Sequence, residues 1–370
     1  MKISILLPLK ENFSPSYAGA VSLFINDTLK FSQFKKDITV FGHTQYKKKF
    51  DRKYFNIEIK KNLFQSQNKE YVKKFIKKEK EINSDIIELH NRPIYLNYLV
   101  HELKQRDYIL YFHNDPLTMS GSKSISERSF LLNNCYRIVF NSNWSKKRFL
   151  YNMKSEAINS EKLIVINQSA KKNIIDFKKK ENIITFVGKL NRSKGYDLFG
   201  NAVIKILKKY KKWRAYVVGD EPRDKLHYKH ERLINFGFKE HEEVIKIYKK
   251  TSIAVVCSRW DEPFGRTSLE AAANGCAVII SNRGGLPETI TNGRILKNLT
   301  IRNIYKDIED LIINSKIRKK YQRLSYKNFY LSHQYVSKQI DNIRFNLSNI
   351  SKPSILNSKS NLRILHITNF

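Results

Sequence analysis

The chain of 370 residues is long enough for two domains of ordinary size, each with its own hydrophobic core. Its 41% hydrophobic and 12% aromatic residues are typical of a globular protein and exclude an intrinsically disordered chain. Three widely spaced cysteines exclude a disulfide framework and a zinc cluster, and they indicate a reducing, cytoplasmic compartment. No apolar run approaches the roughly 18 residues that cross a bilayer.

The formal net charge is +35, from 69 Lys and Arg against 34 Asp and Glu. Such a surface attracts anionic partners, namely nucleic acid, lipid headgroups or acidic glycans. A compositional bias toward Lys, Asn and Ile would instead leave the charge as a solvated surface, and both interpretations stay open. The basic residues are spread widely, and the chain lacks an aromatic RNA-binding signature and a helix-turn-helix. We therefore do not expect a nucleic-acid partner.

Short apolar runs alternate with helix-like segments along the first half of the chain. Most of these runs are continuously apolar, as strands covered on both faces are, which predicts a parallel, doubly wound sheet. The first run is too short for a signal peptide and has no small-residue cleavage site, so we interpret it as a strand. The predicted strands are Ile3–Leu9, Ile38–Gly42, Asp85–Leu89, Tyr108–Phe112, Tyr136–Asn141 and Leu163–Asn167.

A polar, lysine-rich stretch at residues 171–182 interrupts this pattern and is predicted to be a linker. A second series of strands follows it, so we expect two Rossmann-like domains, at residues 1–170 and 183–330. Ligands of such folds bind at the carboxyl ends of the strands, here in the cleft between the domains. The second series is Ile183–Val187, Ala215–Val218, Ile253–Val256 and Ala277–Ser281.

Beyond Asn292 the pattern predicts helices to about Leu347. The last of them, at residues 331–347, is expected to return to the N-terminal domain. Residues 348–361 are rich in Ser and Asn, and residues 362–370 resemble the opening strand. This end, residues 348–370, is either a polar linker with the start of a further domain or a simple edge strand.

The stretch Ser258–Gly275 carries the strongest chemical pattern, because it joins a predicted strand to a predicted helix. Gly265 permits close approach of a ligand to the backbone. The N–H groups of Arg266–Leu269, at the helix start, form an anion site that the helix dipole strengthens. Glu262 precedes the helix and Glu270 lies one turn inside it. One carboxylate can therefore face a sugar while the other reaches a ribose.

A second stretch, Ile184–Gly195, is a strand that enters a glycine-bounded loop with Lys189 and Lys194. Two cations there can clamp a diphosphate and stabilise the charge that develops when a nucleoside diphosphate leaves. In so lysine-rich a chain, two lysines are weak evidence by themselves. The glycine frame is what favours the site.

Together these stretches resemble the donor half of the retaining GT-B glycosyltransferases of family 4, among them bacterial lipopolysaccharide and capsule enzymes. The resemblance covers about residues 183–290. It implies two facing Rossmann-like domains and transfer of a sugar from a nucleoside diphosphate. The matching segments are Gly188-Lys189, Lys194-Gly195, Val217-Val218-Gly219, Gly237-Phe238, Glu262-Pro263-Phe264-Gly265 with Glu270, and Gly284-Gly285-Leu286-Pro287-Glu288.

The resemblance also implies individual roles. Lys189 and Lys194 would hold the diphosphate, Glu270 the ribose, Glu262 the transferred sugar and Phe238 the base. Lys189 stands where arginine is common, and it keeps the charge without the bidentate fork. The donor-binding set is completed by Phe264, Gly265, Arg266 and Thr267.

The N-terminal half resembles the family less closely. Gly19 stands where relatives carry a Gly-Gly loop near the donor phosphate. His113 ends a strand where relatives often place a histidine beside the sugar, so with Glu262 and Lys194 it is a catalytic candidate that can bond a hydroxyl or assist proton transfer. A histidine with ordinary structural partners is the alternative. Asn91-Arg92-Pro93 is a weaker candidate for the acceptor side.

No Asp-x-Asp triplet or Walker loop occurs in the chain, so we expect neither a metal nor a cofactor beyond the donor itself. The densest basic segment, residues 45–80, contains an apolar stripe, Tyr71, Val72, Phe75 and Ile76, at helical spacing. A basic amphipathic helix suits an anionic membrane that presents lipid-linked acceptors. The alternative, which we favour slightly, is a surface helix whose stripe packs on its own sheet.

The resulting hypothesis is retaining transfer of a hexosyl group from a UDP-, GDP- or ADP-sugar to a hydroxyl of a glycan or glycolipid acceptor. The process would be the synthesis of a cell-surface polysaccharide or lipopolysaccharide, in the cytoplasm or at the inner face of the membrane. Two alternatives are a GT-B-shaped sugar-nucleotide epimerase and a basic nucleic-acid-binding protein.

Overall fold

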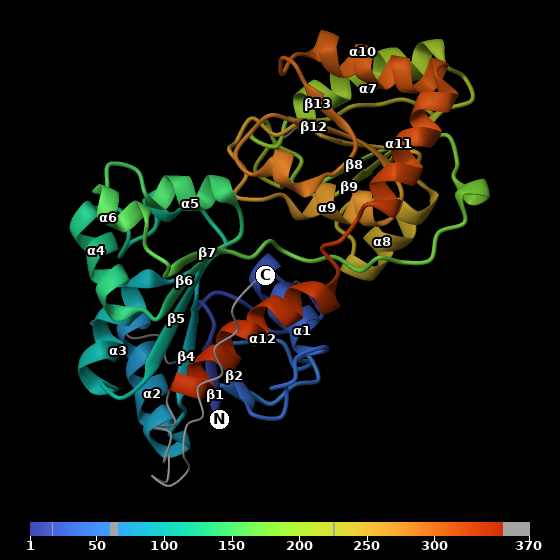
Figure 1. The fold of residues 1–370 in the computed structure, drawn as a ribbon. Coiled ribbons are helices and arrows are strands. Elements are labelled where there is room, and N and C mark those ends of the chain that lie inside the picture. The colour runs from blue at the N-terminus through green and yellow to red at the C-terminus, as the bar shows by residue number, and fades with distance from the viewer. Residues whose placement is uncertain (17, 60–65, 225, 351–370) are drawn as a thin grey trace, which may run out of the picture.

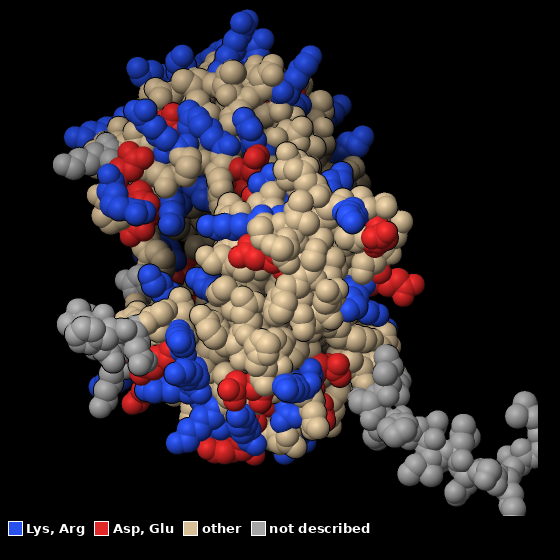
Figure 2. Space-filling view, turned by 90° about the vertical axis from the view of Figure 1, so that its left-hand side faces the viewer, with Lys and Arg blue, Asp and Glu red and all other residues tan. Residues whose placement is uncertain are grey.

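The computed structural model describes residues 1–16, 18–59, 66–224 and 226–350. The chain forms two lobes, an N-terminal one and a C-terminal one, each built around its own sheet (Figure 1). Lys and Arg are spread over both lobes on the face shown in Figure 2, and the surface is hollowed between the lobes.

The N-terminal lobe contains a seven-stranded sheet in which every strand pair is parallel. The spatial order, β3-β2-β1-β4-β5-β6-β7, reverses direction between β1 and β4, as in doubly wound folds. The strands are β1 (Ile3–Leu6), β2 (Ile38–Gly42), β3 (Tyr54–Asn56), β4 (Ile86–His90), β5 (Asp107–Phe112), β6 (Arg137–Phe140) and β7 (Leu163–Val165).

Helices cover both faces of this sheet because alternate residues of each strand point to opposite sides. In β5, Ile109 and Tyr111 join the core beneath α1 and α12, whereas Leu110 and Phe112 join the core beneath α2 to α5. The helices of this lobe are α1 (Ala20–Leu29), α2 (Gln67–Ile82), η1 (Pro93–Tyr95), α3 (Leu96–Glu102), η2 (Pro116–Thr118), α4 (Ile125–Asn134), α5 (Asn143–Phe149), α6 (Ser155–Ile158) and the returning α12 (His333–Ile350).

The C-terminal lobe repeats the plan with a six-stranded sheet in the order β10-β9-β8-β11-β12-β13, again parallel throughout. Its central strands β8, β11 and β12 are almost wholly buried, which explains their continuous apolar sequences. The strands are β8 (Ile183–Val187), β9 (Arg214–Val218), β10 (Leu233–Asn235), β11 (Ile253–Val256), β12 (Ala277–Ser281) and β13 (Arg294–Leu296).

Two apolar cores lie on the two faces of this second sheet. Helices α7 and α10 pack on one face, and α8 and α9 pack on the other. The prediction of two doubly wound, Rossmann-like parallel-sheet domains is therefore confirmed. The helices are η3 (Phe177–Lys179), α7 (Tyr196–Lys209), α8 (His241–Lys250), α9 (Arg266–Ala273), η4 (Leu286–Thr289), α10 (Ile301–Ile313) and α11 (Ser315–Lys327).

Helix α12 leaves the C-terminal lobe and packs beside α1 of the N-terminal lobe (Figure 1). A buried ion pair anchors it, since Arg344 donates to both Glu88 oxygens, at 2.7 and 2.8 Å. Asp341 accepts from Arg344 and from Ser32 Oγ, so one buried guanidinium is shared between two carboxylates, and Asp341 has a second hydrogen-bond donor.

One prediction about this region is wrong, because the segment after Asn292 first forms the strand β13, Arg294–Leu296, before the helices begin. The predicted strand-like end at residues 362–370 lies outside the described residues. Residues 351–361 of the predicted polar linker lie outside them as well. In the part of the chain that the structure describes, no helix is both long enough and apolar enough to cross a bilayer.

The apolar stripe of α2 packs on its own sheet. Tyr71, Val72 and Phe75 have no exposed surface and Ile76 has 7%, all within the core beneath the sheet. The stripe therefore has no face to offer a membrane. Contact of the surrounding lysines with anionic lipid stays a prediction.

Candidate active site

A cavity of about 270 Å³ lies between the two lobes, at the carboxyl ends of both sheets. This is where doubly wound folds bind their ligands. The N-terminal lobe contributes Ala20, His113, Asn114 and Asn141 to its lining. The segment that connects the lobes contributes Gln168. The C-terminal lobe contributes Phe186, Val187, Gly188, Lys194, Val256, Ser258, Trp260, Glu262, Pro263, Phe264, Gly265, Arg266 and Thr267.

The turn between β11 and α9 forms most of the C-terminal wall. Gly265 is the N-cap residue of α9, with φ +117°, and a Cβ there would lie 2.4 Å from Leu286 Cδ2. A Cβ on Gly284 would lie 2.2 Å from the Glu262 carbonyl oxygen. Glycine is required at both positions because any side chain would push the two loops apart. The loop that follows β12 therefore fixes the position of Glu262.

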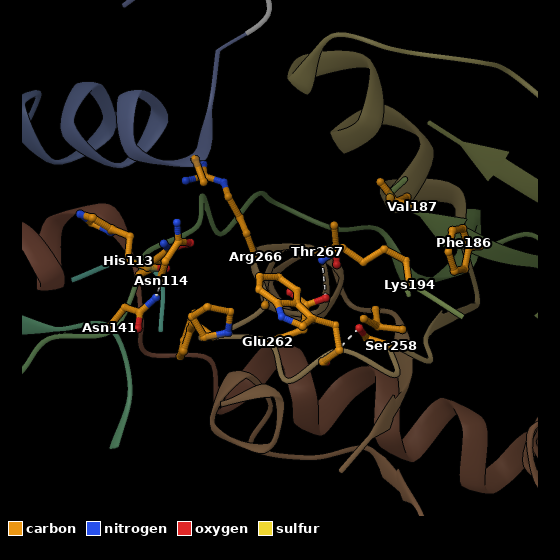
Figure 3. Close-up of a pocket in the computed structure, with 18 residues that line it drawn as sticks. His113, Asn114, Asn141, Phe186, Val187, Lys194, Ser258, Glu262, Arg266 and Thr267 are labelled. Carbon is orange, nitrogen blue, oxygen red and sulfur yellow. Dashed lines mark hydrogen bonds and ion pairs between the residues drawn. The ribbon is translucent and has the colours of Figure 1, made fainter. Parts of the chain in front are cut away.

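Lys194 and Glu262 form an ion pair inside the cavity, with Nζ 2.5 Å from Oε1. The Lys194 ammonium also lies 4.6 Å from the centroid of the Trp260 ring, a cation–π contact. Figure 3 shows Lys194 and Glu262 on the same side of the cavity, beside Thr267 at the start of α9. A cation, a helix N-terminus and a carboxylate therefore converge at this point.

Arg266 bridges the two lobes. Its Nε donates to Glu270 Oε1 at 2.6 Å, and its Nη2 donates to Asp27 Oδ2 of α1 at 3.0 Å. His241 Nε2 lies 2.8 Å from the same Glu270 oxygen. Burial would raise the pKa of Glu270, but the Arg266 charge and the His241 hydrogen bond outweigh it and lower the pKa. Glu270 is therefore an anion in the folded protein.

Arg266 Nη1 is buried and has no hydrogen-bond partner among the described residues, although Arg266 lines the cavity. A buried guanidinium N–H without a partner is costly. An anionic or hydroxyl-bearing ligand in the cavity is the natural partner for such a group.

The opposite wall is neutral and rigid. His113 Nε2 lies 3.0 Å from His90 Nδ1, and the pKa of His113 falls to about 3 because burial disfavours the charged ring. Its Nδ1 is buried without a hydrogen-bond partner among the described residues. Asn91 Oδ1 accepts from the backbone N–H groups of His113 and Asn114, at 2.9 and 3.1 Å. A neutral, fixed imidazole suits hydrogen bonding to a sugar hydroxyl better than delivery of a proton.

Further hydrogen bonds hold the lobes together beside the cavity. Glu288 accepts from the N–H groups of Asn143 and Trp144, at 2.8 and 3.0 Å, and thereby caps the first turn of α5. Ser142 Oγ donates to the Pro263 carbonyl at 2.5 Å. The segment of residues 284–288, which follows β12, therefore also forms a contact between the lobes.

The predicted site residues fall into two groups. The structure brings His113, Lys194 and Glu262 into the cavity, and with them Phe264, Gly265, Arg266 and Thr267. The others lie outside its lining: Lys189 is exposed on the loop after β8, Phe238 is 46% exposed before α8, Gly19 is the N-cap of α1, and Glu270 is buried behind Arg266. Their assigned roles stay predictions.

Several lining residues were not predicted. Asn114, Asn141 and Gln168 each follow the end of an apolar strand run, and this position at the carboxyl edge is the pattern that marks them. No sequence pattern identifies Asp27, because a single acidic residue within a helix such as α1 is usually interpreted as a solvated surface side chain. Only the folded structure shows its contact with Arg266.

Residues 167–328 match the family described as Glycosyl transferases group 1. Spore coat protein SA of Bacillus subtilis (strain 168) is 23% identical over 364 residues, which cover 88% of this chain and 93% of that protein. An uncharacterized 41.2 kDa protein in the cps region of Klebsiella pneumoniae is 33% identical over 117 residues, 31% of this chain and 32% of that protein. This chain thus spans about a third of that relative's length.

A solved structure of Anabaena Alr3699/HepE, in complex with UDP-glucose, is similar over 94% of this chain and 100% of that chain. The TM-score is 0.71 and the sequence identity is 17%, so the likeness concerns the fold. The protein therefore has the GT-B fold, and its residues 167–328 match the model of the glycosyl transferases group 1.

Proposed function

We propose that this protein transfers a hexosyl group from a nucleoside diphosphate sugar to a hydroxyl of a glycan or glycolipid, with retention of the anomeric configuration. The observation that carries the proposal is the convergence of Lys194, Glu262 and the N-terminus of α9 in the cavity between the lobes. The match to the glycosyl transferases group 1 supports it.

The diphosphate is assigned to the start of α9 and to Lys194. The first N–H groups of a helix have no partner within the helix, and the dipole adds partial positive charge there. Lys194 brings a full charge to the same point. This charge stabilises the leaving nucleoside diphosphate more than the intact donor, so it lowers the barrier. In this proposal the lysine and the helix perform the work that a metal performs in other glycosyltransferases.

Glu262 and His113 are assigned to the transferred sugar. They lie on opposite walls, where one offers carboxylate oxygens and the other a neutral ring nitrogen to sugar hydroxyls (Figure 3). Since Glu262 is paired with Lys194, we do not assign it as a nucleophile. We propose front-face attack instead. The acceptor oxygen bonds to the anomeric carbon as the phosphate leaves, and the acceptor proton passes to that phosphate.

The wider setting belongs to the same proposal. Two relatives are named for a cps region and a spore coat, and on this basis we assign the product to a cell-surface polysaccharide or lipopolysaccharide. The enzyme would act in the cytoplasm or at the inner face of the membrane, where its lysines meet anionic lipid.

A thermal-shift screen of UDP-, GDP- and ADP-sugars tests the proposal, because a ligand that binds only the folded protein raises its melting temperature. We expect one nucleotide class to raise it. Product analysis with that donor then distinguishes two kinds of reaction. Transfer or hydrolysis releases the free nucleoside diphosphate, whereas epimerisation yields a new nucleotide sugar. Absence of a shift with every nucleotide sugar would contradict the proposal.

A further inference from the structure

A second cavity, of about 610 Å³, lies in the N-terminal lobe next to the first. It opens at the carboxyl edge of the sheet, after β1, β4 and β5. Asn114 lines both cavities, so they adjoin at the neutral wall that carries His113. A molecule in the second cavity would therefore reach the sugar end of the donor site.

Positive charge dominates this second cavity. Lys10 and Arg92 are its charged lining residues, and no described carboxylate is among its lining. Neither side chain forms an ion pair with a described carboxylate; the Arg92 Nη1 donates instead to the Asn91 carbonyl at 2.9 Å. Two cations without counter-charges beside a cavity form a site for an anion.

An acid in the neighbourhood, Glu11, forms no ion pair with Arg92 among the contacts of the described residues. Glu11 is close enough for the Arg92 charge to lower its pKa, but burial has the larger effect and raises the pKa overall. Glu11 also accepts from the Ser22 N–H at 2.9 Å, at the start of α1. Arg92 is therefore not held in an ion pair with a described carboxylate and can donate to an anionic ligand.

Amide groups line the same cavity and suit sugar hydroxyls. Asn68 accepts from Tyr95 Oη at 3.1 Å and leaves its amide N–H groups available. Asn91 has φ +57°, a left-handed conformation that asparagine tolerates better than most residues. Its side chain holds His113 and Asn114 in place, so the second cavity is tied rigidly to the first.

We propose that this cavity binds the acceptor, and that Lys10 and Arg92 select an acceptor sugar that carries an anionic group. A carboxylate and a phosphate share the required chemistry, because each accepts a bidentate hydrogen bond from arginine. The inference rests on the proposed function, since the cavity needs a sugar donor beside it to act as an acceptor site.

The test measures binding of three probes to the full chain in the presence of the nucleotide found in the donor screen. The probes are methyl β-D-glucuronide, glucose 6-phosphate and the neutral methyl β-D-glucoside. We expect at least one charged probe to bind about tenfold more tightly than the neutral one, because a charge-assisted hydrogen bond exceeds a neutral one by about that factor. The first two probes distinguish a carboxylate from a phosphate.

Two variants locate the effect. Arg92→Gln and Lys10→Gln should each reduce binding of the preferred charged probe about three- to tenfold and leave the neutral probe unchanged. Lys36→Gln is the matched control, because this exposed lysine precedes β2 at the opposite edge of the sheet. The nucleotide should bind all three variants as it binds the wild type.

Equal binding of charged and neutral probes would overturn the inference, and so would a preference that survives in both Arg92→Gln and Lys10→Gln. Failure of both charged probes to bind while the nucleotide still binds would overturn this inference alone. Failure of the nucleotide to bind would instead refute the proposed function.

Discussion

The two walls of the cleft differ in charge and in how they are built. The C-terminal wall holds Lys194, Glu262 and Arg266 on one continuous turn and the loop beside it, and its charges are paired with one another. The N-terminal wall holds His113, Asn114 and Asn141, neutral groups that come from two separate strand ends. We infer from this difference that the charged wall suits the diphosphate, whose negative charge grows as it leaves, and that the neutral wall suits the hydroxyls of the sugar.

The largest expected effect is on the charged wall. Glu262→Ala should lower turnover by about 10²–10³-fold, the usual cost of removing one group that stabilises the transition state. Steady-state kinetics with the identified donor measures this loss. Glu231→Ala, at an exposed glutamate, is the control and should turn over normally. Full activity in Glu262→Ala with an unchanged fold would break the assignment of this wall to the chemistry.

A smaller effect is expected where the walls are joined. Asp27→Asn removes the anion that pairs with Arg266 across the cleft and should lower the free energy of unfolding by about 1.5–3 kcal/mol. Denaturant unfolding measures the change. Asp37→Asn, at an exposed position immediately before β2, should be nearly neutral. Equal stability of the two variants would mean that the bridge does not hold the lobes together.

The smallest effect concerns the neutral wall and depends on pH. His113 takes up a proton near pH 6.5 in the unfolded chain but only near pH 3 when folded. Acid therefore favours the unfolded chain, and His113 should lower the free energy of unfolding by up to about 2 kcal/mol between pH 6.5 and pH 5. The stability that it contributes is fully present above pH 6.5.

The measurement is the free energy of unfolding as a function of pH, compared between the wild type and His113→Asn. This substitution removes the titrating ring and keeps a hydrogen-bonding side chain. The wild type should lose more stability than the variant as the pH falls from 6.5 to 5. Parallel curves for the two proteins would show that His113 is not buried as a neutral ring.

The fold could be predicted because the central strands are buried on both faces and so have continuous apolar sequences. The strands β3, β10 and β13 were missed since each lies at the edge of a sheet, has three residues and is only partly buried. A short, half-exposed strand has neither a continuous apolar run nor a clear alternation.

The same reasoning explains what was predicted of the site. Most residues of the charged wall are neighbours in the sequence, so the role of the turn from Glu262 to Thr267 could be predicted from the sequence alone. Asn141 and Gln168 reach the cavity only because parallel strands bring their carboxyl ends to one edge. Asp27 meets Arg266 only when the lobes are in contact. Contacts between segments that are distant in the sequence produce no repeating residue pattern from which they could be predicted.

The most direct test of the central claim is titration calorimetry of the matching nucleoside diphosphate against the wild type, Lys194→Ala and Lys212→Ala. Lys194 lines the cavity, whereas Lys212 is exposed on the turn before β9. We expect at least about tenfold weaker binding in Lys194→Ala, because the variant loses a hydrogen bond to a charged group. Lys212→Ala should bind like the wild type. Identical affinity in all three proteins would contradict the placement of the donor diphosphate in this cleft.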